Sequence, residues 1–286
     1  MGNNNSSQSS KKGKEKSKSK DDGEYKFRAF SKQYETLGMV QDGLRKAGLE
    51  ASRLMLGIDY TISNTDAGKR TFGGLSLHYL NDDPNLMNPY QQVISTLGRT
   101  LDSFSDNKII PTFGFGSRDT KDQSVFSVAG RPDGLNNGVE NVLESYRVIT
   151  PTIALGGPTS FAPIINKAIE IVKADRAYYI LVIIADGELT PDTEFCNATT
   201  QSMRAVVEAS KYPISIIIVG VGDGPWDQMR HFDNDLPQRR FDNINFVDFD
   251  KEWVGDTIEA KDTSFAIAAL QEIPDQYTAI RKLGYI

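Results

Sequence analysis

The sequence contains very little cysteine and histidine. Cys196 is the only cysteine among the 286 residues, so no disulfide can form within the chain, which fits a reducing compartment. A single cysteine also excludes a RING-type zinc finger, which needs several cysteines and histidines. With only His78 and His231 available, we expect no catalytic histidine, and the sequence gives His78 no chemical role.

Long apolar runs and a basic domain surface are missing as well. No run of eighteen apolar residues is present, so we expect neither a transmembrane helix nor a secretory signal. Residues 1–20 contain six lysines and one glutamate, a net charge of +5, so the −6 of the whole chain leaves −11 for residues 21–286. Nucleic acid requires clustered Lys and Arg, and we therefore expect no nucleic-acid partner.

The basic residues gather instead at the N-terminus. Met1-Gly2-Asn-Asn-Asn-Ser6 fits the pattern in which Gly2 becomes N-myristoylated. One acyl chain binds a bilayer weakly, and each basic residue near an anionic leaflet adds about 1 kcal/mol. The lysines that would do so are Lys11, Lys12, Lys14, Lys16, Lys18 and Lys20.

These features predict that residues 1–24 form a disordered, basic, myristoylated tail. Such a tail would place the chain peripherally at the cytoplasmic face of a membrane, the plasma membrane above all. The alternatives are a solubilising tail without lipid and a lysine run of the nuclear-import kind.

Residues 25–286 are long enough for one large α/β domain. Apolar runs predict strands over 54–59, 109–115, 178–185, 214–221 and 244–249, with a short antiparallel edge strand over 124–128. Helical spacing predicts helices over 34–49, 88–104, 138–148, 160–173, 197–210 and 263–277, and another opened by Pro225. We therefore predict a doubly wound, mostly parallel six-stranded sheet with helices on both faces.

Oxygen-bearing side chains stand where two of these strands end. Asp59 closes the first strand and is followed at alternate positions by Thr61 and Ser63, and Asp186 closes the strand over 178–185. Thr159 stands at the predicted start of the helix over 160–173, where its hydroxyl is either a helix cap or a further ligand. In an open parallel sheet such residues can meet in one crevice, and hydroxyls with carboxylates suit a hard cation.

The pattern Asp59-x-Thr61-x-Ser63, followed by Thr159 and Asp186, resembles the metal-ion-dependent adhesion site of von Willebrand factor A domains, with Thr61 where many of them carry serine. Longer stretches resemble the A domain of copines and of copine-like plant RING-type ubiquitin ligases. They include Ser76-Leu-His-Tyr79, Asn88-Pro-Tyr-Gln-Gln-Val-Ile94 and Val219-Gly-Val-Gly-Asp-Gly-Pro-Trp-Asp227, and the resemblance covers roughly 34–277. Phe241-Asp-Asn243 leans toward the plant-ligase branch.

This resemblance implies a von Willebrand factor A-like, Rossmann-type fold and a non-enzymatic function. The five donors would hold Mg²⁺, or Mn²⁺ or Ca²⁺, and an acidic side chain of a protein partner would complete the shell. The expected function is a membrane-attached, divalent-cation-dependent protein-binding adaptor.

Two alternatives stay open. The chain could act as a scaffold or competitor in a ubiquitin-ligase pathway without ligase chemistry. It could also be a metal-dependent phosphohydrolase of the haloacid dehalogenase type, but those enzymes carry a second aspartate two residues after the nucleophile, where this chain has Thr61.

Overall fold

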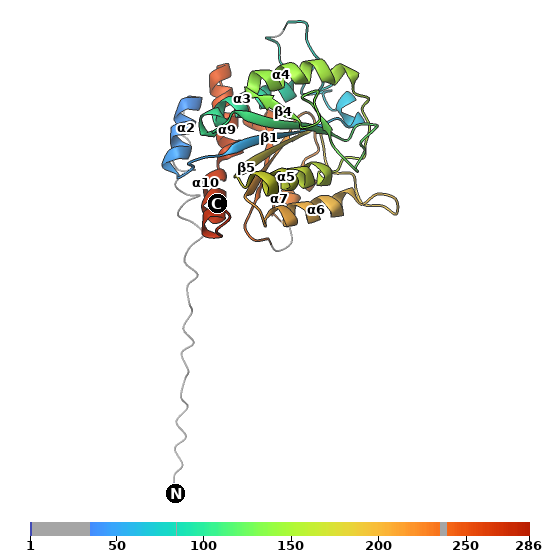
Figure 1. Cartoon of the computed structure of the whole chain (residues 1–286). Coiled ribbons are helices and arrows are strands. Elements are labelled where there is room, and N and C mark those ends of the chain that lie inside the picture. Colours follow the sequence, from blue (N-terminus) through green and yellow to red (C-terminus); the bar gives the residue numbers. More distant parts are fainter. Residues whose placement is uncertain (2–34, 84, 235–238) are drawn as a thin grey trace.

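The computed structural model describes Met1 and residues 35–83, 85–234 and 239–286. Its centre is one sheet covered by helices on both faces (Figure 1). The predicted tail over residues 1–24 lies, apart from Met1, outside the described residues, as does part of the helix predicted from residue 34. Within the described ranges no helix is both long and apolar enough to cross a membrane.

The sheet has the spatial order β3-β2-β1-β5-β6-β7, with β4 also paired to β2. β1, β2, β5, β6 and β7 run parallel, whereas β3 and β4 are antiparallel to β2. The bounds are β1 Arg53–Asp59, β2 Ile109–Phe115, β3 Phe126–Ser127, β4 Leu135–Asn137, β5 Tyr179–Ala185, β6 Ile214–Gly220 and β7 Ile244–Asp248. The doubly wound, mostly parallel fold is confirmed.

The helices lie between and after these strands. They are α2 Leu37–Lys46, α3 Pro89–Leu101, α4 Gly138–Ile149, α5 Ala162–Asp175, α6 Ala198–Ala209, α7 Asp227–Asn234, α8 Phe249–Glu252, α9 Ile258–Leu270 and α10 Ile273–Lys282. Short 3₁₀ helices are η1 Ile62–Thr65, η2 Asp102–Phe104 and η3 Thr150–Thr152. Asn88 caps α3, since its side chain accepts a hydrogen bond from the Gln91 backbone N–H.

Alternation along the central strands divides the core between the two faces. In β5, Ile180, Val182 and Ile184 pack on the face covered by α2, α3, α4, α9 and α10. Leu181 and Ile183 pack on the opposite face against α5 and α6. All seven β5 residues are buried because both faces are covered, which is why the strand lacks polar alternation in the sequence.

Three predictions about the elements are wrong. The sheet has seven strands rather than six, because Leu135–Asn137 adds a strand too short to show a pattern. The helix predicted over 263–277 is two helices, α9 and α10. Pro274 is in the first turn of α10, where its missing N–H costs nothing, whereas inside one long helix its ring would clash with the preceding turn. Thr159 does not cap a helix, since α5 begins only at Ala162.

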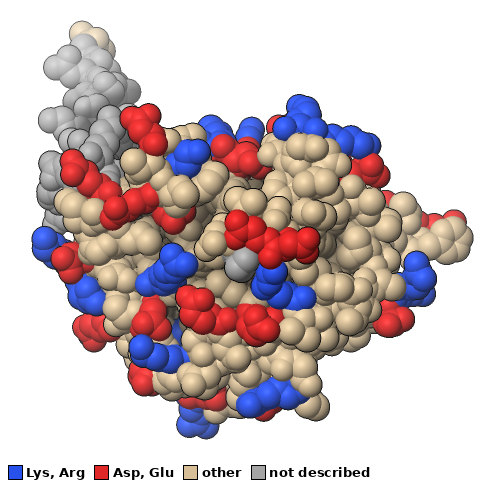
Figure 2. Space-filling model, turned by 90° about the horizontal axis from the view of Figure 1, so that it is seen from above, with Lys and Arg blue, Asp and Glu red and all other residues tan. Residues whose placement is uncertain are grey.

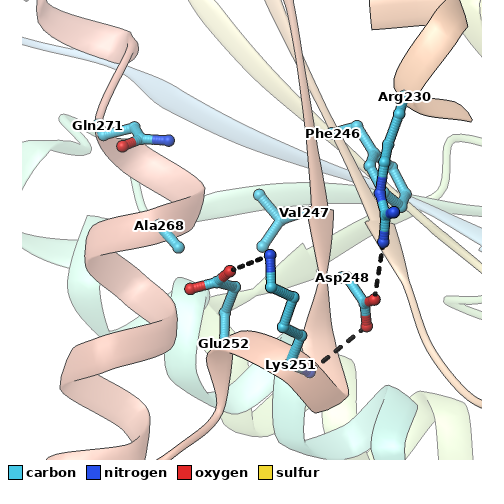
Figure 3. Close-up of a pocket in the computed structure, with 8 residues that line it drawn as sticks. All are labelled: Arg230, Phe246, Val247, Asp248, Lys251, Glu252, Ala268 and Gln271. Atoms are coloured by element: carbon cyan, nitrogen blue, oxygen red, sulfur yellow. Dashed lines mark hydrogen bonds and ion pairs between the residues drawn. The ribbon is translucent and has the colours of Figure 1, made fainter. Parts of the chain in front are cut away.

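The last strand, β7, forms one edge of the sheet. A hollow of about 350 Å³ lies along this edge, between α7 on one side and α9 on the other (Figure 3). Its charged side chains are paired: Arg230 Nη2 lies 3.6 Å from Asp248 Oδ2, and Lys251 Nζ lies 3.6 Å from Glu252 Oε1. Phe246, Val247, Ala268 and Gln271 complete its lining.

Candidate metal site at the carboxyl ends of β1 and β5

The topology brings Asp59 and Asp186 together. β1 pairs with β2 on one side and with β5 on the other, so the direction of winding reverses between β1 and β5. Asp59 is the last residue of β1, and Asp186 directly follows β5. Both acids therefore lie at the switch point of the sheet, where ligands of doubly wound folds bind.

Hydroxyl groups connect the two acids. The Ser63 hydroxyl donates to Asp186 Oδ1 at 3.0 Å, and the Thr61 hydroxyl lies 3.4 Å from the same oxygen. The Thr61 and Ser63 hydroxyl oxygens are 3.0 Å apart. The Thr61 backbone N–H donates to Asp59 Oδ1 at 2.8 Å, which fixes the first carboxylate relative to the loop.

Each acid has one oxygen without a partner. Asp59 Oδ2 and Asp186 Oδ2 are buried and accept no hydrogen bond from any described residue. Leaving a buried carboxylate oxygen unpaired is costly, and a cation would satisfy both. The described residues contain no group of three or more His, Cys, Asp or Glu side chains that could hold a metal. Two carboxylates with hydroxyls are nevertheless a donor set that fits a hard ion such as Mg²⁺.

The pKa shifts of the two carboxyls show the cost of burial without a counter-charge. Burial raises the pKa of Asp186 to about 6. Burial, and then the charge of Asp186, hold the pKa of Asp59 well above its usual range. Metals are bound by deprotonated carboxylates, so a divalent ion here would compete with protons for the pair.

Thr159 reaches the same cleft from another element. Its backbone N–H donates to the Thr190 hydroxyl at 2.9 Å, and its carbonyl accepts from the Thr190 N–H at 3.1 Å. These bonds connect Thr159 to the segment after β5, and Thr159 lines the cleft together with Thr61, Ser63 and Asp186. The structure thus places four of the five predicted donors around one cleft, with the fifth, Asp59, fully buried beside them.

Gly116 allows the backbone after β2 to approach the site. Its φ is +75°, and a Cβ on it would lie 2.5 Å from Thr61 Cγ2 and 3.4 Å from Asp59 Oδ1. Any side chain here would be strained and would displace Thr61. In the sequence, Gly116 directly follows the strand predicted over 109–115.

His78 has a structural role, packed among aromatic rings and hydrogen-bonded at both ring nitrogens. Its Nε2 lies 2.8 Å from the Asp59 carbonyl oxygen, and its Nδ1 lies 2.8 Å from the Tyr146 hydroxyl. Because a carbonyl can only accept, Nε2 carries the proton and Nδ1 accepts from Tyr146. The ring stacks between Tyr60 and Tyr90, with centroids 4.6 and 4.3 Å away.

This stack is buried and uncharged. Burial lowers the pKa of His78 to about 4, so the ring is neutral at pH 7. Asn88 Nδ2 donates to the Tyr146 hydroxyl at 3.1 Å, so a chain of hydrogen bonds runs from the start of α3 to the end of β1. Tyr90 donates to Asn64 Oδ1 at 2.7 Å, and Asn64 holds the Thr61 carbonyl at 3.1 Å. Two motifs of the resemblance, 76–79 and 88–94, thus contribute residues that orient the loop over 61–64, which carries two of the predicted donors.

We expect His78→Ala to lower the free energy of unfolding by about 2–4 kcal/mol, since it leaves a cavity and removes a donor from the Asp59 carbonyl. Metal affinity should fall by about tenfold or more, as it does when groups that orient ligands are lost. Calorimetric titration with Mg²⁺ and chemical denaturation measure the two effects. Tyr60→Phe is the control within the same stack, because it keeps the ring and removes a buried hydroxyl that is hydrogen-bonded to Thr150 and not to the Asp59 carbonyl. If His78→Ala is destabilised but binds metal as tightly as the parent, the aromatic stack contributes to packing alone and does not orient the metal ligands.

The cleft is large and open to solvent, with a volume of about 600 Å³. Its acidic lining residues have partners within the protein: Asp66 pairs with Lys69 at 2.8 Å, and Asp223 accepts from the backbone N–H groups of Arg70 and Thr71. Over the face of the molecule in Figure 2, acidic and basic side chains are interleaved and form no continuous basic surface.

A family model described as Copine matches residues 76–286 of this chain. The E3 ubiquitin-protein ligase RGLG2 of Arabidopsis thaliana is 46% identical over 270 residues, which cover 92% of this chain and 57% of that protein. RGLG3 of the same plant is 46% identical over 259 residues, 88% of this chain and 69% of that protein. Copine family protein 2 of Caenorhabditis elegans is 48% identical over 255 residues, 88% of this chain and 3% of that protein.

The chain therefore spans only part of the length of these relatives, little more than half in the case of RGLG2. Similar solved structures include a von Willebrand factor type A protein from Catenulispora acidiphila, with a TM-score of 0.46 and 13% identity over 77% of this chain and 42% of that one. Another is the manganese-loaded TRAP protein of Plasmodium vivax, with a TM-score of 0.40 and 14% identity over 71% of this chain and 70% of that one.

Proposed function

Because this chain belongs to the copine family, we propose that it is a protein-binding adaptor whose cleft holds a divalent cation. Asp59, Thr61, Ser63, Thr159 and Asp186 would hold the ion, Mg²⁺ first and Mn²⁺ or Ca²⁺ as alternatives. The ion supplies a positive charge at the base of the cleft. An acidic side chain of a partner protein would complete its coordination from solvent.

The observation that carries this proposal is the pair of orphaned oxygens, Asp59 Oδ2 and Asp186 Oδ2, beside hydroxyls in an open cleft. A protein gains nothing in stability from two buried like charges without a counter-ion, so the arrangement is explained best by a bound cation. The test is thermal unfolding with and without Mg²⁺, on the parent chain and on variants of the two acids.

Binding is favoured over catalysis by the accessibility of Asp59. Its side chain is 0% exposed, so it cannot attack a phosphoryl group of a substrate in the cleft. The position of a general acid two residues later is held by Thr61, whose hydroxyl is turned toward Asp186 and Ser63. These features oppose the phosphohydrolase alternative and support a non-enzymatic function for the described domain.

The relatives named as ubiquitin ligases favour a second candidate, a scaffold or competitor in a ubiquitin-ligase pathway. This role uses the same cleft and differs only in the partner. Co-purification of ubiquitin-pathway proteins with the parent chain, lost on chelation with EDTA, would support it.

The N-terminal segment supports attachment to a membrane. Its Gly2 pattern and six lysines would give reversible, peripheral binding to an anionic cytoplasmic leaflet. The described domain begins at Glu35, whose carbonyl accepts from the Thr263 hydroxyl of α9 at 3.5 Å. α2, the first described helix after this segment, lies at the end of the sheet opposite the carboxyl ends of β1 and β5 (Figure 1).

We expect Gly2→Ala to move most of the protein from the membrane fraction to the soluble fraction, because the acylated amine is lost while the lysines remain. Fractionation of cells that express the parent and the variant measures this. Replacing Ser7 by alanine is the control, since it leaves the Gly2 and Ser6 positions of the pattern unchanged. Equal membrane fractions for parent and Gly2→Ala would refute lipid attachment.

A further inference from the structure

Ile62 lies in the loop that carries two of the predicted metal ligands, yet it is 61% exposed. Its backbone N–H donates to the Gly156 carbonyl at 2.8 Å, and its neighbours Thr61 and Ser63 turn their hydroxyls toward Asp186. The side chain of Ile62 lines the cleft from this fixed position. The loop thus presents an apolar side chain directly beside the ion site.

Other apolar groups continue the wall of the cleft. They are Ala67, Pro158, Pro191 and Pro225, with Leu189 buried behind them. Glu188, which also lines the cleft, accepts the Gln228 backbone N–H at 2.6 Å, and the lining acids Asp66 and Asp223 have the partners given above. With an ion bound, the cleft would therefore offer a partner a cation and an apolar wall beside it, while these three carboxylates are held by bonds within the protein.

We propose that the partner of this cleft is a protein segment in which an Asp or Glu stands within two residues of a bulky apolar side chain. The acid binds the ion, and the apolar side chain packs on Ile62 and the proline-rich wall. This inference rests on the proposed function, because the acid has no site without the cation. Apolar contact adds affinity in proportion to the area removed from water, and it distinguishes this segment from other acidic segments.

The first experiment selects random peptides displayed on phage with the full chain in Mg²⁺ and elutes them with EDTA. The eluted peptides should be enriched in an acid with Ile, Leu, Met, Val or Phe within two positions. A second selection uses Ile62→Ser, and should keep the acid and lose the apolar enrichment. Ile258→Ser is the matched control, since Ile258 is also an exposed isoleucine, 71% exposed, but lies outside the cleft at the start of α9. Selection on this control should match the parent.

The second experiment changes the peptide instead of the protein. Replacing the apolar residue of a selected peptide by serine should weaken its binding to the parent chain by about tenfold, as measured by fluorescence anisotropy. The same replacement should change little on Ile62→Ser, and the rise in melting temperature with Mg²⁺ shows whether that variant keeps its metal site.

The outcomes separate the two levels of the proposal. If Mg²⁺ does not raise the melting temperature of the parent and EDTA elutes no peptide, the proposed function fails. If EDTA elutes acidic peptides that lack an apolar companion, or the serine replacement in the peptide leaves affinity for the parent unchanged, only the inference about the partner fails.

Discussion

Saturating Mg²⁺ should raise the melting temperature of the parent chain by about 5–10 °C, and Asp59→Asn or Asp186→Asn should abolish the rise. A ligand at about 100 times its dissociation constant stabilises the folded state by about 2.7 kcal/mol. For a domain of this size each kcal/mol corresponds to about 2–4 °C. Each variant removes a carboxylate from a site that has only two, so little affinity for a divalent ion remains.

The same variants should not destabilise the metal-free protein. Asp186→Asn removes one of two buried like charges, and the new amide can donate a hydrogen bond to the Asp59 carboxylate. We therefore expect its melting temperature in EDTA to equal or exceed that of the parent. A variant that is at least as stable as the parent without metal, and that is not stabilised by Mg²⁺, indicates that Asp186 is a metal ligand rather than a residue that stabilises the fold.

Asp66→Asn is the control for charge. Asp66 lines the same cleft, but its side chain is 72% exposed and paired with Lys69. The variant loses the same unit of charge and should respond to Mg²⁺ as the parent does. Mn²⁺ and Ca²⁺ are tested in parallel, and differential scanning fluorimetry is sufficient for every combination. A parent chain indifferent to all three ions would overturn the assignment of the site.

The second large effect is on how the free energy of unfolding depends on pH in the absence of metal. The folded Asp186 carboxyl, with its pKa raised to about 6, binds a proton more tightly than the unfolded one at 3.8. The contribution of Asp186 to the free energy of unfolding is therefore fully present below about pH 4 and is lost as the pH rises through about 6. A shift of this size corresponds to about 3 kcal/mol.

His78 acts in the opposite direction over nearly the same range. Its pKa is lowered to about 4 from 6.5, so the folded state binds its proton less tightly, and stability falls as the pH drops from about 6.5 to 4. The pH profile of the parent chain alone combines these two opposing contributions with that of Asp59, whose raised pKa acts in the same direction as that of Asp186. The informative quantity is the free energy of unfolding of the parent minus that of Asp186→Asn, which cancels the His78 contribution.

We expect that difference to fall by about 3 kcal/mol between pH 4 and pH 7 in EDTA, measured by urea denaturation. With saturating Mg²⁺ the difference should instead increase with pH, since the ion binds only the deprotonated pair. A difference that stays flat in EDTA would mean that the two carboxyls do not titrate as a buried pair, and would weaken the case for the cation.

Much of the fold was accessible from the sequence because burial leaves a simple pattern. The apolar runs of β5 and β6 predicted central strands, and their bounds agree with the prediction within one residue. The errors arise where a feature is too short or ambiguous to leave a pattern. β4 has three residues, and the apolar spacing of α9 continues into α10, so only Pro274 indicated the break.

The positions of the two acids in the candidate site could be predicted from the sequence, but the residues that hold them in place could not. Strand ends and topology predicted that Asp59 and Asp186 would lie together, and they do. The role of the aromatic stack was not predictable, since His78 reaches the Asp59 carbonyl from a loop without regular structure. Nor does a sequence reveal which carboxylate oxygens lack partners. Those oxygens are the strongest support for a cation, and they depend on side-chain packing from four separate segments.

The two edges of the sheet also affect how the molecules behave at high concentration. A long, flat and open edge of a sheet rich in isoleucine and valine can pair with a strand of another chain, because its backbone N–H and C=O groups are unpaired. Here the β2 side is covered by two short antiparallel strands, and β7 is only five residues long, with the Arg230–Asp248 and Lys251–Glu252 ion pairs beside it. Strand pairing between copies of the chain is thereby disfavoured at both edges of the sheet.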